Sequence, residues 1–303
     1  MIALWALALA SAQLETILTI DPRHRLVEGI ATDGTTIWVS SVLDRTILAC
    51  TKSCRRLAQL PRGLHPLGIA WDPRRKRLWV AADCPKLPGV DPCERGSLVA
   101  LDKSGQLRTR IGPGGNSFHP GDVSASAAGV FVSDSSNGAV YRVGASGQSL
   151  SPIVEPGLGT SAQGSVLDPT GERLIIADYN QGLVAVERRS GKRTLLPDED
   201  GAAIRGIDGL VRCGGGFVGV YNGSAQGKLV AITLREGGVS RSDLIEGLQL
   251  PDSTQIAFDG SRLLIVSNAG WPAATRVGGV RSEGASIIAI PVDGDCKVIS
   301  PET

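Results

Sequence analysis

Residues 28–41, with the sequence EGIATDGTTIWVSS, carry the pattern that decides the fold. A polar residue and a glycine precede a short apolar strand, a turn with Asp and Gly follows, and a second strand completes a hairpin. The pattern recurs in units that begin near residues 67, 121, 163, 208 and 254. Each unit continues with a third apolar strand, such as TILAC at residues 46–50.

The spacing of these units predicts the architecture. Successive units start roughly 40 to 50 residues apart, which is the length of one four-stranded blade of a β-propeller. No segment of helical period competes with the strand alternation, and a parallel β-solenoid would need shorter repeats. We therefore predict an all-β, six-bladed β-propeller with four-stranded antiparallel blades over residues 13–303.

The composition agrees with many short strands joined by tight turns. The chain contains 39 glycines, only 4% aromatic residues and one methionine. Glycine tolerates the positive φ angles that such turns need. The 31 basic and 30 acidic side chains leave a net charge of +1, so we expect no nucleic-acid partner. We expect a monomer that binds a small molecule.

The first twelve residues, MIALWALALASA, read as a secretory signal peptide. The apolar run ends in Ala10-Ser11-Ala12, the small-x-small pattern at which signal peptidase cleaves. It is too short to cross a hydrocarbon layer of about 30 Å, so we expect no membrane span. No Lys or Arg precedes the run, which leaves a buried first strand as the alternative. The first reading predicts export to the periplasm or the extracellular medium.

Six cysteines support export, because an even number of cysteines in an exported chain indicates disulfides. We predict three pairs, which are Cys50 with Cys54 across a short turn, Cys84 with Cys93 around a proline-rich loop, and Cys213 with Cys296 by elimination. On the propeller, the last pair lies on one face and joins blades five and six. No pair has the spacing of a zinc knuckle.

Two segments can supply the outer strand that closes the ring. Residues 14–20 (LETILTI) precede blade one, and residues 296–299 (CKVI) follow blade six. Either segment would cover an edge that is otherwise prone to aggregation.

The first strand of each blade lines the central channel of a propeller. If the repeats are in register, six equivalent side chains meet at the channel mouth, namely Glu28, Leu67, Gly121, Gln163, Asp208 and Thr254. Two carboxylates and an amide oxygen suit Ca²⁺ or another oxophilic divalent ion. The alternative is a channel filled with water and hydrogen-bonded polar residues.

These residues resemble a known family. The blade layout and several short motifs are similar to those of senescence marker protein (regucalcin), gluconolactonase and luciferin-regenerating enzyme, over about residues 25 to 295. The motifs are Glu28-Gly29, Gln163-Gly164, Asp208-Gly209-Leu210, Ala177-Asp178-Tyr179 and Tyr221-Asn222-Gly223. Strictosidine synthase-like and paraoxonase-like proteins share this superfold, so the fold alone does not assign the reaction.

The resemblance implies one divalent metal ion, usually Ca²⁺ in this family, and hydrolysis of lactones or related esters. By position, Glu28 and Asp208 correspond to the family's acidic ligands. Gln163 replaces the Asn ligand of blade four, and its amide oxygen lies one methylene further out. Gly121 replaces a second Asn in blade three, a loss for which Asp122 can compensate. The resemblance therefore still implies a metal site with this set of residues, whereas it places activity on sugar lactones in doubt.

The expected reaction is attack of water on a carbonyl polarised by the ion, with Asp208 as the catalytic residue that accepts the proton. Further residues on the same face are candidates for substrate binding, namely Asp122, His65, His119, Asp178, Asn222 and Trp271. Each has a structural alternative. The histidines can cap loops, Asp178 and Asn222 can form side-chain-bonded turns, and Trp271 can pack beneath the loop that follows it.

Two functions follow from this set. The first is an exported, divalent-metal-dependent hydrolase of a small lactone or ester. The second is a non-catalytic propeller that binds a small ligand or a protein partner through its channel face. No GxSxG motif, P-loop or dinucleotide fingerprint is present, so serine hydrolase and nucleotide-dependent chemistry have no support in the sequence.

Overall fold

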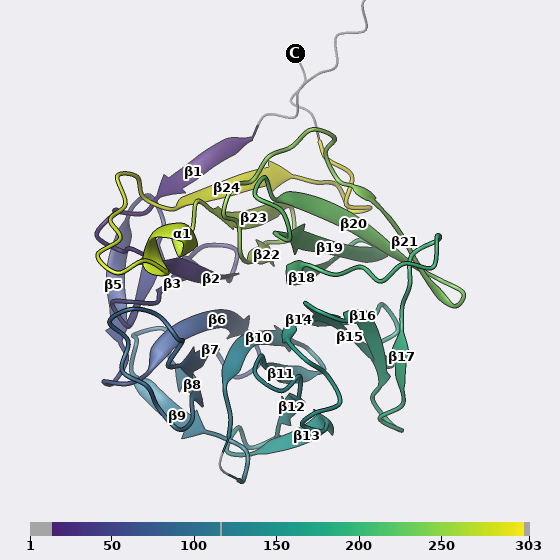
Figure 1. The fold of residues 1–303 in the computed structure, drawn as a ribbon, viewed down its shortest axis with the longest axis horizontal. Coiled ribbons are helices and arrows are strands. Elements are labelled where there is room, and N and C mark those ends of the chain that lie inside the picture. The colour runs from purple at the N-terminus through teal and green to yellow at the C-terminus, as the bar shows by residue number, and fades with distance from the viewer. Residues whose placement is uncertain (1–13, 116, 300–303) are drawn as a thin grey trace, which may run out of the picture.

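The chain forms a ring of six antiparallel sheets around a central channel (Figure 1). The computed structural model describes residues 14–115 and 117–299. Each sheet has four strands, and the described residues add one short helix, α1 (Trp271–Ala274). The six-bladed, all-β propeller expected from the repeats is therefore confirmed.

The blades follow one another in chain order. Blade one contains β2 (Val27–Thr32), β3 (Ile37–Ser41), β4 (Thr46–Cys50) and β5 (Cys54–Gln59), blade two contains β6 (His65–Asp72), β7 (Arg77–Asp83), β8 (Ser97–Leu101) and β9 (Leu107–Ile111), and blade three contains β10 (Pro120–Ser126), β11 (Gly129–Asp134), β12 (Val140–Val143) and β13 (Leu150–Val154). Blade four contains β14 (Ala162–Leu167), β15 (Arg173–Asp178), β16 (Gly182–Glu187) and β17 (Arg193–Leu195), blade five contains β18 (Ile207–Cys213), β19 (Gly216–Tyr221), β20 (Lys228–Arg235) and β21 (Gly238–Asp243), and blade six contains β22 (Ile256–Phe258), β23 (Arg262–Ser267), β24 (Ser286–Pro291) and β1 (Glu15–Thr19).

The ring is closed by the N-terminal of the two candidate segments. Strand β1 pairs antiparallel with β24 and becomes the outer strand of blade six (Figure 1). The C-terminal segment instead folds back on its own blade, where Val298 forms an isolated bridge with Val292. Blade six therefore joins both ends of the described chain, which covers the edge of β24.

Apolar side chains fill the spaces between neighbouring blades. Each of the six blade interfaces has its own buried cluster, such as Trp38, Leu78 and Val80 between blades one and two. The alternation of the strands places these side chains on the two faces of every sheet, and packing between sheets removes them from water. The polar residues of the inner strands are left to face the channel.

Three disulfides join the pairs Cys50–Cys54, Cys84–Cys93 and Cys213–Cys296, as the sequence predicts. The first spans the turn between β4 and β5, and the second closes the loop between β7 and β8. The third links the end of β18 in blade five to the hairpin after β24 in blade six. Disulfides of this number are typical of proteins from oxidising compartments outside the cytosol.

The predicted signal peptide, residues 1–12, lies outside the described residues. Within residues 14–115 and 117–299, no helix has the length and hydrophobicity needed to cross a bilayer.

Candidate functional site

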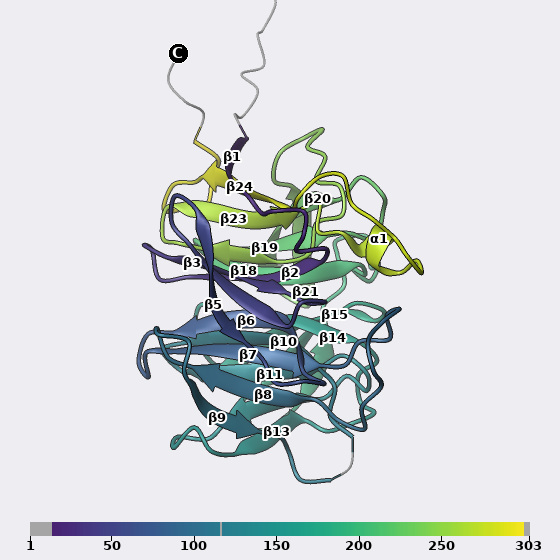
Figure 2. The same cartoon turned by 90° about the vertical axis from the view of Figure 1, so that its left-hand side faces the viewer.

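A cavity of about 1540 Å³ opens at one end of the channel. Residues from all six blades line it, and they come from the loops that enter the inner strands and from the loops between second and third strands. Helix α1 lies on this side of the ring (Figure 2). The cavity therefore forms on the face that the sequence assigned to the candidate site.

The inner strands have bulges at the level of the predicted ligands. In five blades the register of the first strand shifts at this point, across residues 28–29, 67–68, 121, 163–164 and 208–209. A bulge leaves its residues out of the ladder and re-aims their side chains. Here the shift directs Glu28, Gln163 and Asp208 into one cavity.

The glycine that follows each of these residues is required by the neighbouring blade. A Cβ on Gly164 would lie 2.7 Å from the carbonyl oxygen of Asp208, and one on Gly209 would lie 2.9 Å from the backbone nitrogen of Ile256. A Cβ on Gly29 would overlap the carbonyl oxygen of Leu67. The inner strands thus approach so closely that only glycine fits, which explains the recurring polar-Gly pair.

Glu28 is buried beneath Trp271, whose indole Nε1 donates a hydrogen bond to Glu28 Oε2 at 2.7 Å. Burial raises the pKa of Glu28 well above its usual value, and the negative charge of Asp208 raises it further. Asp252 fixes the start of α1, because its Oδ2 accepts the backbone N–H groups of Gly270 at 2.5 Å and Trp271 at 3.1 Å. Trp271 is therefore both a wall of the cavity and a fixed partner of Glu28.

Asp208 is held by a neighbouring amide. Asn222 Nδ2 donates to Asp208 Oδ2 at 2.9 Å and to the carbonyl oxygen of Ser253 at 3.0 Å. Burial raises the pKa of Asp208 to about 7. Tyr179 also lines the cavity, and burial together with the charge of Asp208 raises the pKa of its hydroxyl. Asp208 can therefore take up a proton near neutral pH.

Gln163 presents its amide oxygen beside Gly121. Its Nε2 donates to Ser161 Oγ at 3.1 Å, which fixes the orientation of the amide. A Cβ on Gly121 would lie 2.9 Å from the side chain of Ser135 and 3.5 Å from Gln163 Oε1. Ser135 thus occupies the space where the family resemblance places an Asn, and a larger residue at Gly121 would displace it.

Asp122 lies in the channel but does not line this cavity. It borders a second cavity of about 480 Å³ at the opposite end of the channel. Its carboxylate fills space left open by Gly68, where a Cβ would overlap it. Burial raises the pKa of Asp122 to about 7, and the charge of Asp208 contributes to this shift. Asp122 therefore adds a third buried carboxylate to the channel, away from the predicted substrate pocket.

The donor set fits an oxophilic divalent cation. Within the described chain, none of the three channel carboxylates forms an ion pair with Lys or Arg. The buried Asn222 Oδ1 also has no hydrogen-bond partner among the described residues. The oxygens of Glu28, Asp122 and Asp208 do not all lie within 4.8 Å of one another, so one Ca²⁺ would not contact all three at distances of roughly 2.4 Å. Gln163 with Glu28 and Asp208 remains the ligand set that shares the cavity.

Besides Asp122, two predicted substrate-binding residues lie outside the residues that line the cavity. His65 is buried in β6, and its Nδ1 contacts the carbonyl oxygen of Val42 at 2.9 Å. Asp178 is buried at the end of β15, where backbone and side-chain groups of Thr160 donate to it at 2.7 Å. These donors lower the pKa of Asp178 despite its burial. These contacts are those of a loop cap for His65 and of a side-chain-bonded turn for Asp178.

The sequence analysis did not single out Asp83, Asp252 and Arg281, which are among the residues that line the cavity. Arg281 donates to the carbonyl oxygens of Ala269 at 2.7 Å and of Asn268, and so fixes the loop around α1. A signal existed for Asp83, because it is the last residue of a second strand. Asp252 and Arg281 lie in loops of blade six without a repeated pattern.

No protein-family model matches the chain, and the search of curated proteins gives no match. Solved structures match over nearly the whole chain. A gluconolactonase from Xanthomonas campestris is 16% identical with a TM-score of 0.63, and the match covers 95% of this chain and 93% of that one. The neighbours of this fold include gluconolactonases.

Other neighbours have different activities. The PQQ-bound aldose sugar dehydrogenase from Streptomyces coelicolor is 14% identical with a TM-score of 0.61, covering 92% of this chain and 98% of that one. A chain of the nidogen/laminin complex is 12% identical with a TM-score of 0.55, covering 71% and 84%. At these identities the likeness shows the propeller fold alone.

Proposed function

We propose that this protein is an exported, divalent-metal-dependent hydrolase of a small lactone or ester. The observation that carries the proposal is the convergence of Glu28, Gln163 and Asp208 on one cavity, with Glu28 buried, Asp208 half-buried and neither carboxylate paired with a basic side chain in the described chain. The similarity of fold to gluconolactonases supports it. The three disulfides and the apolar residues 1–12 support export.

A divalent ion, Ca²⁺ in the first place, would be held by Glu28, Gln163 and Asp208 and would supply Lewis-acid polarisation of the carbonyl group when bound. Residues of the chain itself take up the proton of the attacking water. Asn222 Nδ2 donates to Asp208 Oδ2 at 2.9 Å and Gln255 Nε2 to Oδ1 at 3.5 Å, so the carboxylate that accepts a proton from the attacking water is held by two amides. Trp271 forms an apolar wall that limits access of further water to the carboxylate of Glu28.

Turnover of an aliphatic lactone with and without Ca²⁺ tests this proposal. We expect hydrolysis by the wild-type protein that EDTA abolishes, and loss of both turnover and Ca²⁺-dependent thermal stabilisation in Asp208→Ala and Glu28→Gln. Asp243→Ala is the matched control, because Asp243 is an exposed carboxylate on β21 that pairs with Lys228. Full activity of Asp208→Ala would contradict the mechanism.

The second candidate is a propeller that binds a protein partner through the same face. Val277 and Val280 favour it, because they are 91% and 85% exposed in the loop after α1, and Val280 borders the cavity. A chain of the nidogen/laminin complex is also a structural neighbour. An absence of lactone and ester turnover with every divalent metal ion tested would favour the partner-binding function.

A further inference from the structure

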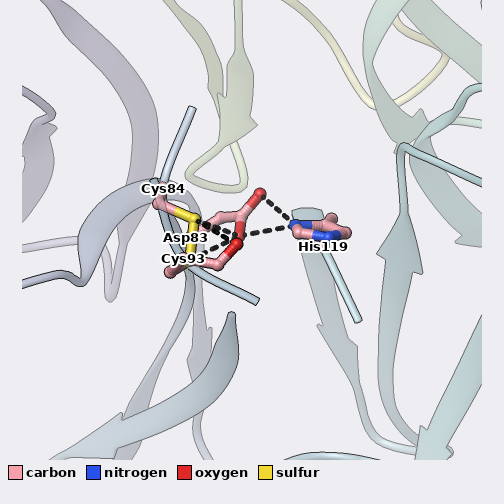
Figure 3. The surroundings of a disulfide bond; sticks show 4 residues. All are labelled: Asp83, Cys84, Cys93 and His119. Atoms are coloured by element: carbon pink, nitrogen blue, oxygen red, sulfur yellow. Dashed lines mark hydrogen bonds and ion pairs between the residues drawn. A yellow bond between two sulfur atoms is a disulfide. The ribbon is translucent and has the colours of Figure 1, made fainter. Parts of the chain in front are cut away.

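A histidine and a carboxylate form a pair in the wall of the cavity, outside the channel carboxylates. His119 lies in the loop that enters β10, and Asp83 is the last residue of β7 in the neighbouring blade. His119 Nδ1 lies 3.0 Å from Asp83 Oδ1 and 3.2 Å from Oδ2 (Figure 3). The side chain of Asp83 is only 9% exposed, whereas that of His119 is 26% exposed and borders the cavity.

The backbone around His119 is fixed on both sides. Its N–H donates to Asp134 Oδ2 at 3.1 Å, and its carbonyl oxygen accepts the N–H of Ser135 at 3.1 Å. The Cys84–Cys93 disulfide lies directly beside Asp83 and ties down the loop that follows it (Figure 3). The pair is therefore a rigid constellation and not a mobile surface contact.

This geometry leaves one ring nitrogen available. Because Nδ1 faces the carboxylate, Nε2 lies on the opposite edge of the ring, where the described residues provide no hydrogen-bond partner. Gly121, two residues further along the chain, borders the same cavity beside Gln163. Two residues span at most about 7 Å, so His119 lies near the part of the cavity where Gln163 presents its amide oxygen.

We infer that His119 is the general acid that protonates the leaving oxygen when the ester opens, and that Asp83 is the positioning residue that orients its ring. This inference rests on the proposed hydrolase function. It assigns a partner to Asp208, because hydrolysis needs one group that removes a proton from water and another that supplies a proton to the alkoxide. A histidine held by a carboxylate through Nδ1 is suited to that second task.

The proton balance closes over one turnover. The water oxygen bonds to the carbonyl carbon, and Asp208 takes its proton. The acyl C–O bond breaks, and the leaving oxygen receives the Nε2 proton of the His119 imidazolium, which becomes neutral and keeps Nδ1–H on Asp83. Asp208 then releases its proton to solvent and His119 takes one up, so one lactone and one water give one hydroxy acid.

The test compares two leaving groups in the presence of Ca²⁺. An aliphatic δ-lactone expels a basic alkoxide that needs a proton, whereas p-nitrophenyl acetate expels a phenolate that does not. We expect His119→Gln to lower kcat/KM for the lactone by about 100-fold or more, with a much smaller loss for the aryl ester. Asp83→Asn should show the same preference with a loss of about 10-fold. The ratio of the two kcat/KM values does not depend on the fraction of the variant that is folded. A destabilised variant therefore still tests the role of His119.

The control is a second pair of the same chemistry outside the cavity. His24 Nδ1 lies 2.9 Å from Asp44 Oδ2, and neither residue borders the cavity. His24→Gln should leave the ratio of the two rates unchanged. Equal losses on both substrates in His119→Gln, or no loss on the lactone, would overturn the general-acid role while the hydrolase function stands. A wild-type protein inactive on both substrates would overturn the hydrolase function and the general-acid role with it.

Discussion

Replacing Asp122 with asparagine should stabilise the metal-free protein, and the gain should grow with pH. Asp122 is buried in the channel, and its pKa is raised from the usual 3.8 to about 7. At low pH, a carboxyl group with a raised folded-state pKa is protonated in both the folded and the unfolded state, so it does not lower the free energy of unfolding there. As the pH rises through 3.8 the unfolded state ionises first, and the folded state loses stability until the pH exceeds about 7.

The size of the effect follows from the two pKa values. A difference of about 3 pKa units corresponds to about 4 kcal/mol of unfolding free energy, lost progressively between pH 4 and slightly above pH 7. Roughly 2 to 3 kcal/mol of that loss falls between pH 5 and pH 8. Asn cannot ionise, so the difference between the variant and the wild type should widen by this amount over the same interval. The fixed cost of burying the amide cancels in that comparison.

Urea unfolding followed by tryptophan fluorescence, in EDTA and with the disulfides intact, measures this difference at each pH. Asp178→Asn is the matched control, because Asp178 is equally buried but hydrogen-bond donors lower its pKa. The ionised Asp178 carboxylate stabilises the folded state above pH 4, and this stabilisation is lost only in stronger acid. Asp178→Asn should therefore lower the unfolding free energy by a constant amount between pH 5 and pH 8. Parallel curves for Asp122→Asn and the wild type would refute the reasoning.

Three further changes test the site and its support. Trp271→Phe keeps the cavity wall but removes the indole donor to the channel glutamate, so calorimetry should show Ca²⁺ affinity about 10-fold weaker. Gly68→Ala places a Cβ on the channel aspartate and should lower the unfolding free energy by about 3 kcal/mol, whereas Gly215→Ala meets no atom within 4 Å and should be nearly neutral in the same urea titration. The double variant Cys213→Ser and Cys296→Ser opens a loop of 83 residues and should cost about 4 kcal/mol, measured by the urea midpoint.

The repeat made the architecture and much of the site predictable. Once the inner strands were in register, Glu28, Gln163 and Asp208 had to meet, because equivalent positions of a closed ring share one axis. The same register places Cys213 and Cys296, which were paired by elimination, on one face of neighbouring blades. These features depend on the periodicity of the chain and not on any single side-chain contact.

The two His-Pro pairs show that the repeat pattern does not predict where every side chain lies. His65 and His119 both precede proline at the entry to an inner strand, and the sequence treats them alike. In the structure His65 is already the first residue of β6, whereas His119 lies just before β10. A shift of one residue turns a side chain to the other face of a strand. Only His119 therefore reaches the cavity, where Asp83 holds it.

The pair of His119 and Asp83 also depends on a distance that no local pattern encodes. The two residues lie 36 positions apart on adjacent blades, and a proline-rich loop separates them in the chain. Asp252 and α1 likewise arise from irregular loops of the sixth blade. Such contacts depend on how the blades pack against one another, so the sequence pattern alone does not predict them.

The pairing of β1 with β24 sets the order in which the molecule can be completed. Glu15 lies opposite Ala289, so the first described strand waits for a partner made at the far end of the chain. At ribosomal rates of about 5 to 20 residues per second, that wait is roughly 15 to 60 seconds, during which five blades can form from local hairpins. The sixth cannot, and β1 stays an unpaired, aggregation-prone strand throughout synthesis. Contact order thus makes ring closure the step at which a nascent chain is most vulnerable.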